Sequence, residues 1–454
     1  MNASLRLVVL GVAFVRRFLS QLQPGLVLLL GYSSYILLGW GLLALPWSRA
    51  TTNGTWLDLL FVSTSAVSTT GLSPLSTGND FTGFGQGVVL LLLQLGGLGY
   101  MVLGSFLVLA TTGKLNERRA SIVRYALSLP ASIEVNGMLR LITLYTLVCE
   151  ALGALLLTWR FSSIGIEQPL WQGIFHAASA FSTAGFGLLD NSLENYKSDW
   201  VINGTIIGLS YAGAIGFLIV NDLWKSMRER KFQATLTSKI ILISTSLISS
   251  VTILGLLIEE KLWAEASFGD AFLMAWFQAM SASTTVGFNS VPIGELTQAS
   301  AFLLLLCMLI GSSPCGTGGG IKTTSVTACW SILMATLRGN PKPTFFGREI
   351  PELRRRLAVA TVMFYLITLS VGIYCIAIVE TQDIFDLAFE CASALGTVGL
   401  SRGITGQLGD PALGILIVLM FIGRIGPLAL AASFFHFKSR QAEPQQVIEE
   451  DIVI

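Results

Sequence analysis

One short pattern, Thr-x-Gly followed by Phe or Leu, occurs four times in this sequence at intervals of about 110 residues. A single copy would mean little in a chain with 46 glycines. Each copy, however, follows an apolar stretch too short to cross a membrane and precedes a longer apolar run. Self-similarity at a nearly constant period indicates an architecture of repeated units. The four copies occupy residues 68–72, 182–186, 283–288 and 396–400.

The composition places these units in a lipid bilayer. Of 454 residues, 53% are hydrophobic and only 12% charged, whereas soluble domains carry about 25% charged residues. Apolar runs of about 20 residues predict an integral membrane protein. A net charge of +1 provides no field to attract nucleic acid, so no nucleic-acid partner is expected. No paired carboxylates, catalytic triad or metal cluster points to an enzyme.

The order of apolar runs predicts an all-α integral membrane protein with eight spans, arranged as four pseudo-symmetric units around one central pore. Each unit consists of a span, a half-length helix, the Thr-x-Gly loop and a second span. The expected units are residues 24–124, 125–236, 237–356 and 357–437, after a cytoplasmic interfacial segment at 1–23 and before a cytoplasmic tail at 438–454. The expected spans are 24–46, 83–111, 137–161, 200–224, 238–259, 300–336, 357–379 and 411–437, and the half-length helices are 55–68, 169–181, 268–283 and 383–395.

Lysine and arginine gather in the segments that follow each second span and in both termini. By the positive-inside rule these basic segments and the termini are cytoplasmic, so the Thr-x-Gly loops face outside. We expect a multi-pass protein of the plasma (inner) membrane. The outer loops are rich in acidic residues, which would concentrate cations, although exposed charge is also what loops ordinarily contain.

The Thr-x-Gly loops have the chemistry of a cation-selective filter. Non-helical backbone at membrane depth must be buried or line water. Glycine permits positive φ, so successive carbonyls can point the same way, and stacked carbonyl rings replace the hydration shell of a monovalent cation. The alternative is that the motif only caps short helices for packing. The predicted filter, which binds the ion through backbone carbonyls alone, comprises Ser68, Thr69, Thr70, Gly71, Ser182, Thr183, Ala184, Gly185, Thr284, Thr285, Val286, Gly287, Gly396, Thr397, Val398 and Gly399.

A second feature, the glycine-rich stretch 311–325, interrupts the second span of the third unit only. It superficially resembles a nucleotide-binding P-loop, but Ile321 stands where that motif requires glycine before the lysine, and the setting is transmembrane. We interpret the stretch as a gate below the filter, with Lys322 facing a wet cavity or the cytoplasm. The predicted gate residues are Gly316, Thr317, Gly318, Gly319, Gly320 and Lys322.

A third feature is Arg424, which lies inside the last apolar run. An intramembrane arginine is by default a functional hypothesis. We expect its partner to be the 311–325 loop, with the guanidinium as a positive barrier beneath the filter. The alternative is a structural salt bridge to Glu150 or Asp222.

The four loops, the glycine-rich run 313–324 and Arg424 together resemble the superfamily of K⁺-translocating subunits that includes the Trk, Ktr and HKT transporters. The resemblance implies that Gly71, Gly185, Gly287 and Gly399 are filter glycines for K⁺, that the glycine-rich run is an intramembrane gating loop, and that Arg424 is the barrier residue. Glycine rather than serine at position 71 implies K⁺ preference over Na⁺.

Only 23 residues precede the first expected span, so the chain is most similar to the Ktr-type ion-translocating membrane subunit. That type implies a homodimer and Na⁺-stimulated K⁺ uptake. It also implies a separate cytoplasmic nucleotide-binding regulatory ring, through which ATP or ADP acts, with no covalent cofactor. The basic loops 114–124, 225–231 and 338–356 are where we expect the ring to bind.

The alternative function is a secondary symporter for a solute and Na⁺, whose broken helices would hold substrate at the midplane. Such a protein would show two inverted halves and substrate-reading side chains near the breaks. Four units of the same sense favour the K⁺ channel or transporter.

Overall fold

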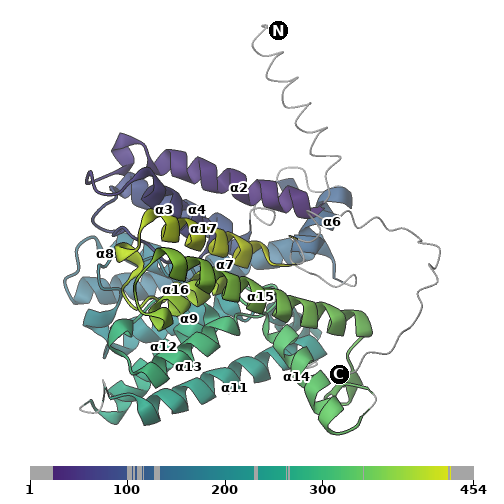
Figure 1. Ribbon diagram of the computed structural model, residues 1–454. Helices are drawn as coiled ribbons and strands as arrows, with labels where there is room; N and C mark the ends of the chain where they lie inside the picture. The colour runs from purple at the N-terminus through teal and green to yellow at the C-terminus, as the bar shows by residue number, and fades with distance from the viewer. Residues whose placement is uncertain are drawn as a thin grey trace, which may run out of the picture.

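The computed structural model describes residues 24–99, 105, 108–109, 115, 117–126, 133–229, 234–261, 263, 266–340, 342–427 and 430, which form mostly helices (Figure 1). The predicted N-terminal segment 1–23 and the tail 438–454 lie outside these residues, as do parts of the basic loops. In Figure 1 the helices α2, α11 and α15 run in broadly the same direction, with α6 and α14 toward one end of the molecule.

Four long apolar helices stand where the first span of each unit was predicted. They are α2 (Pro24–Leu43), α7 (Val135–Ser163), α11 (Leu236–Glu259) and α15 (Glu352–Val379). All four have the length and composition to cross a membrane.

A short helix follows each long one, within one residue of its predicted bounds. These helices are α3 (Trp56–Ser68), α8 (Pro169–Phe181), α12 (Phe268–Thr284) and α16 (Ile384–Gly396). Their starts are specified locally. Thr55 and Asp58 form a capping box at α3, and the side chains of Ser267 and Asp383 cap α12 and α16. Pro169 occupies the first turn of α8, where its missing N–H costs nothing.

The second apolar run of each unit differs from the prediction. The helices in these runs are short: α4 (Gly83–Leu98), α9 (Trp200–Ala214), α13 (Gln298–Leu309) and α17 (Asp410–Ile425). Three further helices follow, α6 (Glu117–Ala126), α10 (Phe217–Glu229) and α14 (Thr323–Leu337).

The prediction that only the third unit's second span is interrupted is therefore wrong. Gly99, Gly216 and Gly426 follow the ends of α4, α9 and α17 with φ of 78°, 94° and 76°, a conformation that glycine adopts readily and that ends a helix. Helices α9 and α10 are bent by 90° at their break. Within the described residues, four helices, or five when α9 and α10 count as one bent span, have the length and composition of a membrane crossing.

The remaining elements are connectors. Two strands, β1 (Thr344–Phe345) and β2 (Arg348–Glu349), pair antiparallel in the basic loop between α14 and α15, a small departure from the all-α prediction. Four single 3₁₀ turns, η1 to η4, lie at Pro46–Ser48, Glu194–Tyr196, Ile293–Glu295 and Thr405–Gln407.

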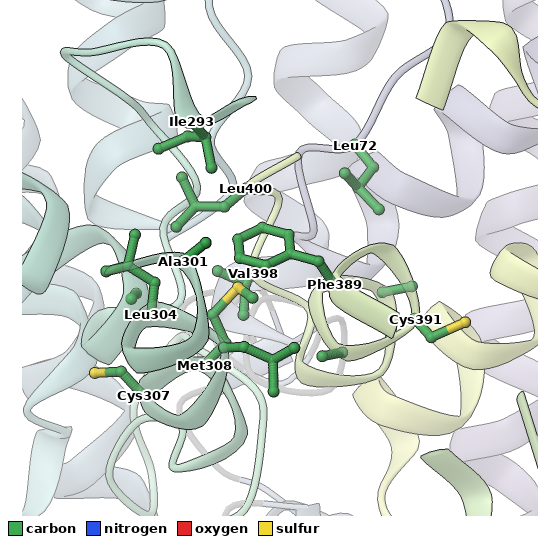
Figure 2. Packing of buried hydrophobic residues seen from close by; sticks show 14 of the residues in the cluster. Leu72, Ile293, Ala301, Leu304, Cys307, Met308, Phe389, Cys391, Val398 and Leu400 are labelled. Atoms are coloured by element: carbon green, nitrogen blue, oxygen red, sulfur yellow. The ribbon is translucent and has the colours of Figure 1, made fainter. Parts of the chain in front are cut away.

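The short helices and the second helices contact one another in a closed circle. Helix α4 contacts α8, α9 contacts α12, α13 contacts α16, and α17 at the end of the chain contacts α3 near its beginning. Buried apolar side chains fill these contacts. Leu72 from the first Thr-x-Gly segment lies in the same cluster as Phe389 of α16 and Leu400 of the fourth segment (Figure 2). The segments after the four short helices are thereby brought toward a common centre.

Candidate functional site

The four Thr-x-Gly segments share one backbone conformation. In each, the threonine that follows the short helix has left-handed φ, and the glycine two residues later also has positive φ. Positive φ is uncommon for threonine. The residue between the threonine and the glycine is therefore flanked on both sides by a residue with positive φ. The φ values are 52°, 50°, 61° and 49° at Thr69, Thr183, Thr285 and Thr397, and 92°, 68°, 86° and 98° at Gly71, Gly185, Gly287 and Gly399.

These four glycines form a closed ring, called the glycine ring below. A Cβ atom added to any one of them would come closer than 3.0 Å to a carbonyl oxygen of the next segment, a separation that real Cβ atoms essentially never show. The chain order is kept around the ring and the fourth segment contacts the first. The approached oxygens, in order from Gly71, belong to Ala184, Val286, Val398 and Thr70. All the predicted filter segments therefore meet at one place, with four backbone oxygens beside four glycines.

A serine that the sequence analysis missed anchors each segment. The N–H of the residue before each glycine donates to the carbonyl of the serine five residues earlier, at 2.8 to 3.1 Å. The donor and acceptor pairs are Thr70 with Ser65, Ala184 with Ser179, Val286 with Ser281, and Val398 with Ser393. In every unit the sequence reads Ser-Ala-x-x-Thr-x-Gly, so a longer repeat would have identified these serines.

The serine hydroxyls divide the four units into two pairs. The hydroxyls of Ser65 and Ser393 accept hydrogen bonds at 3.0 Å from the N–H groups of Gly71 and Gly399. Those of Ser179 and Ser281 are buried without a partner. The first and fourth segments are thus held by one more hydrogen bond than the second and third.

The 311–325 loop lies directly against the helix ends that carry the glycine ring. The Thr317 hydroxyl is 3.1 Å from that of Thr183 and donates to the carbonyl of Phe181 at 3.1 Å. The Gly319 N–H donates to the Thr285 hydroxyl at 3.1 Å. A Cβ at Gly318 or Gly319 would clash with the hydroxyl of Thr285 or Thr397. Glycine is required at these positions because the loop backbone approaches the helix ends so closely.

Lys322 binds the loop that carries it. Its Nζ donates to the carbonyl of Gly318 at 2.6 Å, and the Gly319 carbonyl and the Ser312 hydroxyl both lie 3.4 Å away. The side chain is partly exposed, and its facing a wet cavity or the cytoplasm stays a prediction. Loop carbonyls provide the partners that a charge at this depth needs.

Arg424 contacts the 311–325 loop, the partner expected from the sequence. Its Nη1 donates to the Thr317 carbonyl at 2.6 Å. Its Nη2 donates to the carbonyl of Gly96, and that of Gly97 lies 3.4 Å away. The side chain therefore bridges the third unit's loop to helix α4 of the first unit.

The alternative salt bridge from Arg424 is not present. The Glu150 carboxylate accepts a hydrogen bond from Gln94 at 2.7 Å. Asp222 accepts from Thr235 and Ser238. Both acidic groups therefore have partners other than the arginine.

Several acidic residues of the predicted outer loops connect neighbouring units. Ser76 and Asn79 donate to Asp190 at 2.7 and 2.8 Å, and Asn289 donates to Glu194 at 2.7 Å. Partial burial raises the pKa of Glu194, and the charge of Glu295 adds to this effect. These residues have structural partners, and the predicted concentration of cations by the loops stays a prediction.

The chain is similar in sequence to known cation transport proteins. Residues 41–441 match the family model described as "TrkH: Cation transport protein". The chain is 35% identical over 431 residues to the Ktr system potassium uptake protein B of Bacillus subtilis, covering 91% of this chain and 93% of that protein. It is 29% identical to the potassium/sodium uptake protein NtpJ of Enterococcus hirae, covering 97% and 99%.

A solved structure, the potassium transporter TrkH from Vibrio parahaemolyticus, has the same fold. It superposes with a TM-score of 0.73 at 20% identity, covering 91% of this chain and 84% of that one. At this identity the likeness concerns the fold alone. With the family match spanning most of the sequence and the B. subtilis relative aligned over nearly its full length, the chain belongs to the TrkH family of cation transport proteins, which are transporters rather than enzymes.

Proposed function

We propose that this protein is the membrane subunit of a K⁺ uptake system and that the glycine ring is its selectivity filter. One observation carries the proposal: four segments with alternating positive φ meet in a closed ring of glycines and carbonyl oxygens. Backbone oxygens arranged around an axis replace the water molecules that a K⁺ ion sheds on entry. In this proposal the ligands are backbone carbonyls alone.

The names of the relatives support K⁺ as the transported ion. The proteins from B. subtilis and Vibrio alginolyticus are potassium uptake proteins, the latter 34% identical over 381 residues. The E. hirae relative is a potassium/sodium uptake protein, which links Na⁺ to transport in this family, and we propose that Na⁺ stimulates uptake here.

The proposed topology has eight crossings in four pseudo-symmetric units. Each second helix crosses together with the segment beyond its glycine break, so that α9 and α10 count as one bent span. A single central pathway is supported by the closed circle of helix contacts, which begins with α4 against α8 and ends with α17 against α3. The filter faces outside, and the basic loops and both termini are cytoplasmic.

The proposed gate is the 311–325 loop in the position seen here. It lies against the threonines that follow α8, α12 and α16, so it closes the ion path immediately below the ring. Arg424 fastens the loop through the Thr317 carbonyl and places a positive charge below the filter. Lys322 stabilises the folded loop through the Gly318 carbonyl.

Opening requires a signal from outside the pore. We propose that a separate cytoplasmic ring, which binds ATP or ADP, moves the loop, and that the protein works as a homodimer in the plasma membrane. The basic loops 114–124, 225–231 and 338–356 form the proposed contact with the ring, and the β1–β2 hairpin lies in the last of them.

The test is ion flux through the purified protein in liposomes. Uptake of Rb⁺, as a stand-in for K⁺, is measured against uptake of Na⁺, with and without the regulatory ring. The proposal predicts Rb⁺ uptake well above Na⁺ uptake. Equal permeability to both ions, or uptake of an organic solute driven by Na⁺ as in a symporter, would contradict it.

A further inference from the structure

Glu390 is a fully buried carboxylate that neither the filter nor the gate uses. It lies in α16, nine residues before Gly399, and no part of it is exposed. The two neighbouring residues, Phe389 and Cys391, belong to the core cluster (Figure 2). A buried carboxylate without hydrogen-bond partners would cost several kcal/mol, so its partners show what holds it there.

Both oxygens of Glu390 accept hydrogen bonds from the segment that follows the glycine ring. Oε1 accepts from the Ser401 hydroxyl, and Oε2 accepts from that of Thr405 at 3.0 Å. The two hydroxyls lie 3.0 Å apart, and Ser401 also accepts the N–H of Gly403 at 2.9 Å. The carboxylate therefore ties the middle of α16 to the chain two residues beyond Gly399.

No ion pair explains the position of Glu390. Arg402, adjacent to Ser401, pairs with Asp386 at 2.5 Å and lies over the ring of Phe385. None of the ion pairs among the described residues includes Glu390. Its hydrogen bonds are therefore its main interactions, and both lead to the outer end of the fourth filter segment.

At the equivalent position of the other units the link is single or missing. In the third unit Gln278 donates to Ser290 at 3.1 Å. In the second unit the position is His176, which stacks against Phe288 and whose Nε2 has no partner. In the first unit it is apolar Val62. Only in the fourth unit does a carboxylate at this position accept two hydrogen bonds from the segment beyond the glycine.

We propose that Glu390 is a positioning residue for ion selection, which fixes the outer end of the fourth filter segment and thereby the carbonyls beside Gly399. Ser393 holds the inner end of the same segment through Val398 and Gly399, so the segment is restrained on both sides of the glycine. The inference rests on the proposed filter function.

The test compares Glu390→Ala and Glu390→Gln in liposomes, with Rb⁺ and Na⁺ uptake measured on the same preparations. Loss of hydrogen bonds to a charged group should lower the Rb⁺ to Na⁺ ratio of the alanine variant about tenfold. The glutamine amide can accept from one hydroxyl and donate to the other, so its ratio should stay within about twofold of the wild type. Glu380→Gln is the matched control: it removes a charge from the same unit, where the carboxylate accepts the N–H of Gly409.

A second variant keeps the test valid if Glu390→Ala does not fold. Ser401→Ala combined with Thr405→Val removes both donors and leaves the carboxylate, and it should lower the ratio in the same way. A wild-type ratio in either folded variant, even with reduced thermal stability, would overturn the positioning role. A wild-type protein that does not distinguish Rb⁺ from Na⁺ would instead contradict the proposed filter itself.

Discussion

Replacing Arg424 with alanine should open the gate. The arginine contacts the loop through one bond, from Nη1 to the Thr317 carbonyl at 2.6 Å, while its bonds to Gly96 and Gly97 hold it on α4. A hydrogen bond from a charged donor contributes about 1.5–3 kcal/mol. Loss of this bond should raise the fraction of proteins with an open gate roughly 10- to 150-fold, provided that most of the wild-type protein is closed. Removing the positive charge beside the ion path acts in the same direction.

The assay is Rb⁺ uptake into liposomes without the regulatory ring, since the gate should then be closed. The matched control is Arg49→Ala. Arg49 also binds three backbone carbonyls, those of Thr52, Asn53 and Gly54 at 3.1, 2.6 and 3.0 Å, but it does so in the loop between α2 and α3, away from the 311–325 loop. We expect basal uptake to rise at least tenfold in Arg424→Ala and to stay unchanged in Arg49→Ala. A folded Arg424→Ala protein with wild-type basal uptake would refute the claim that Arg424 holds the 311–325 loop closed.

Two further predictions concern the ring itself. Gly71→Ser should destroy the preference for Rb⁺ over Na⁺, because φ at Gly71 is 92° and a Cβ there would lie 2.6 Å from the Ala184 carbonyl. The control is Gly204→Ser, because nothing lies within 4 Å of a Cβ added at Gly204. An intact preference in Gly71→Ser would remove the first segment from the filter. Ser65→Ala should lower the preference and the thermal stability, by about 0.5–1.5 kcal/mol for the bond to the Gly71 N–H. Ser179→Ala should cost less, because its hydroxyl has no partner, and equal losses in the two variants would contradict this distinction.

The short helices could be predicted from the sequence because strong local signals mark both ends. Caps such as Thr55 with Asp58 start a helix, and a glycine two residues after each terminal threonine admits the turn that follows. These signals lie within a few residues of one another, so no tertiary information is needed. The family resemblance is confirmed as well, and it rests on the four loops together with the glycine-rich run 313–324 and Arg424.

The breaks in the second helices could not be predicted in this way. Glycine is common in membrane helices and usually leaves them intact, so Gly99, Gly216 and Gly426 do not stand out in apolar runs. Packing distinguishes only Gly216, where a Cβ would lie 2.5 Å from the Pro314 carbonyl in another unit. Nothing lies within 4 Å of a Cβ added at Gly99 or Gly426, so no close contact marks those two breaks.

The side chains behind the filter were missed for a related reason. Glu390 lies within a short apolar helix, and its partners Ser401 and Thr405 lie beyond the repeat. Arg424 could be singled out because an arginine in an apolar run is rare. Its second contact, with Gly96, depends on the closure of the circle between the last helix and the first unit.

Anomalous diffraction from crystals of the full chain grown in Rb⁺ tests the proposed filter most directly. We expect Rb⁺ on the axis of the glycine ring, coordinated by the backbone carbonyls of the four segments. An empty ring, with Rb⁺ bound at side chains elsewhere in the protein, would contradict the claim that backbone oxygens at this ring select the ion.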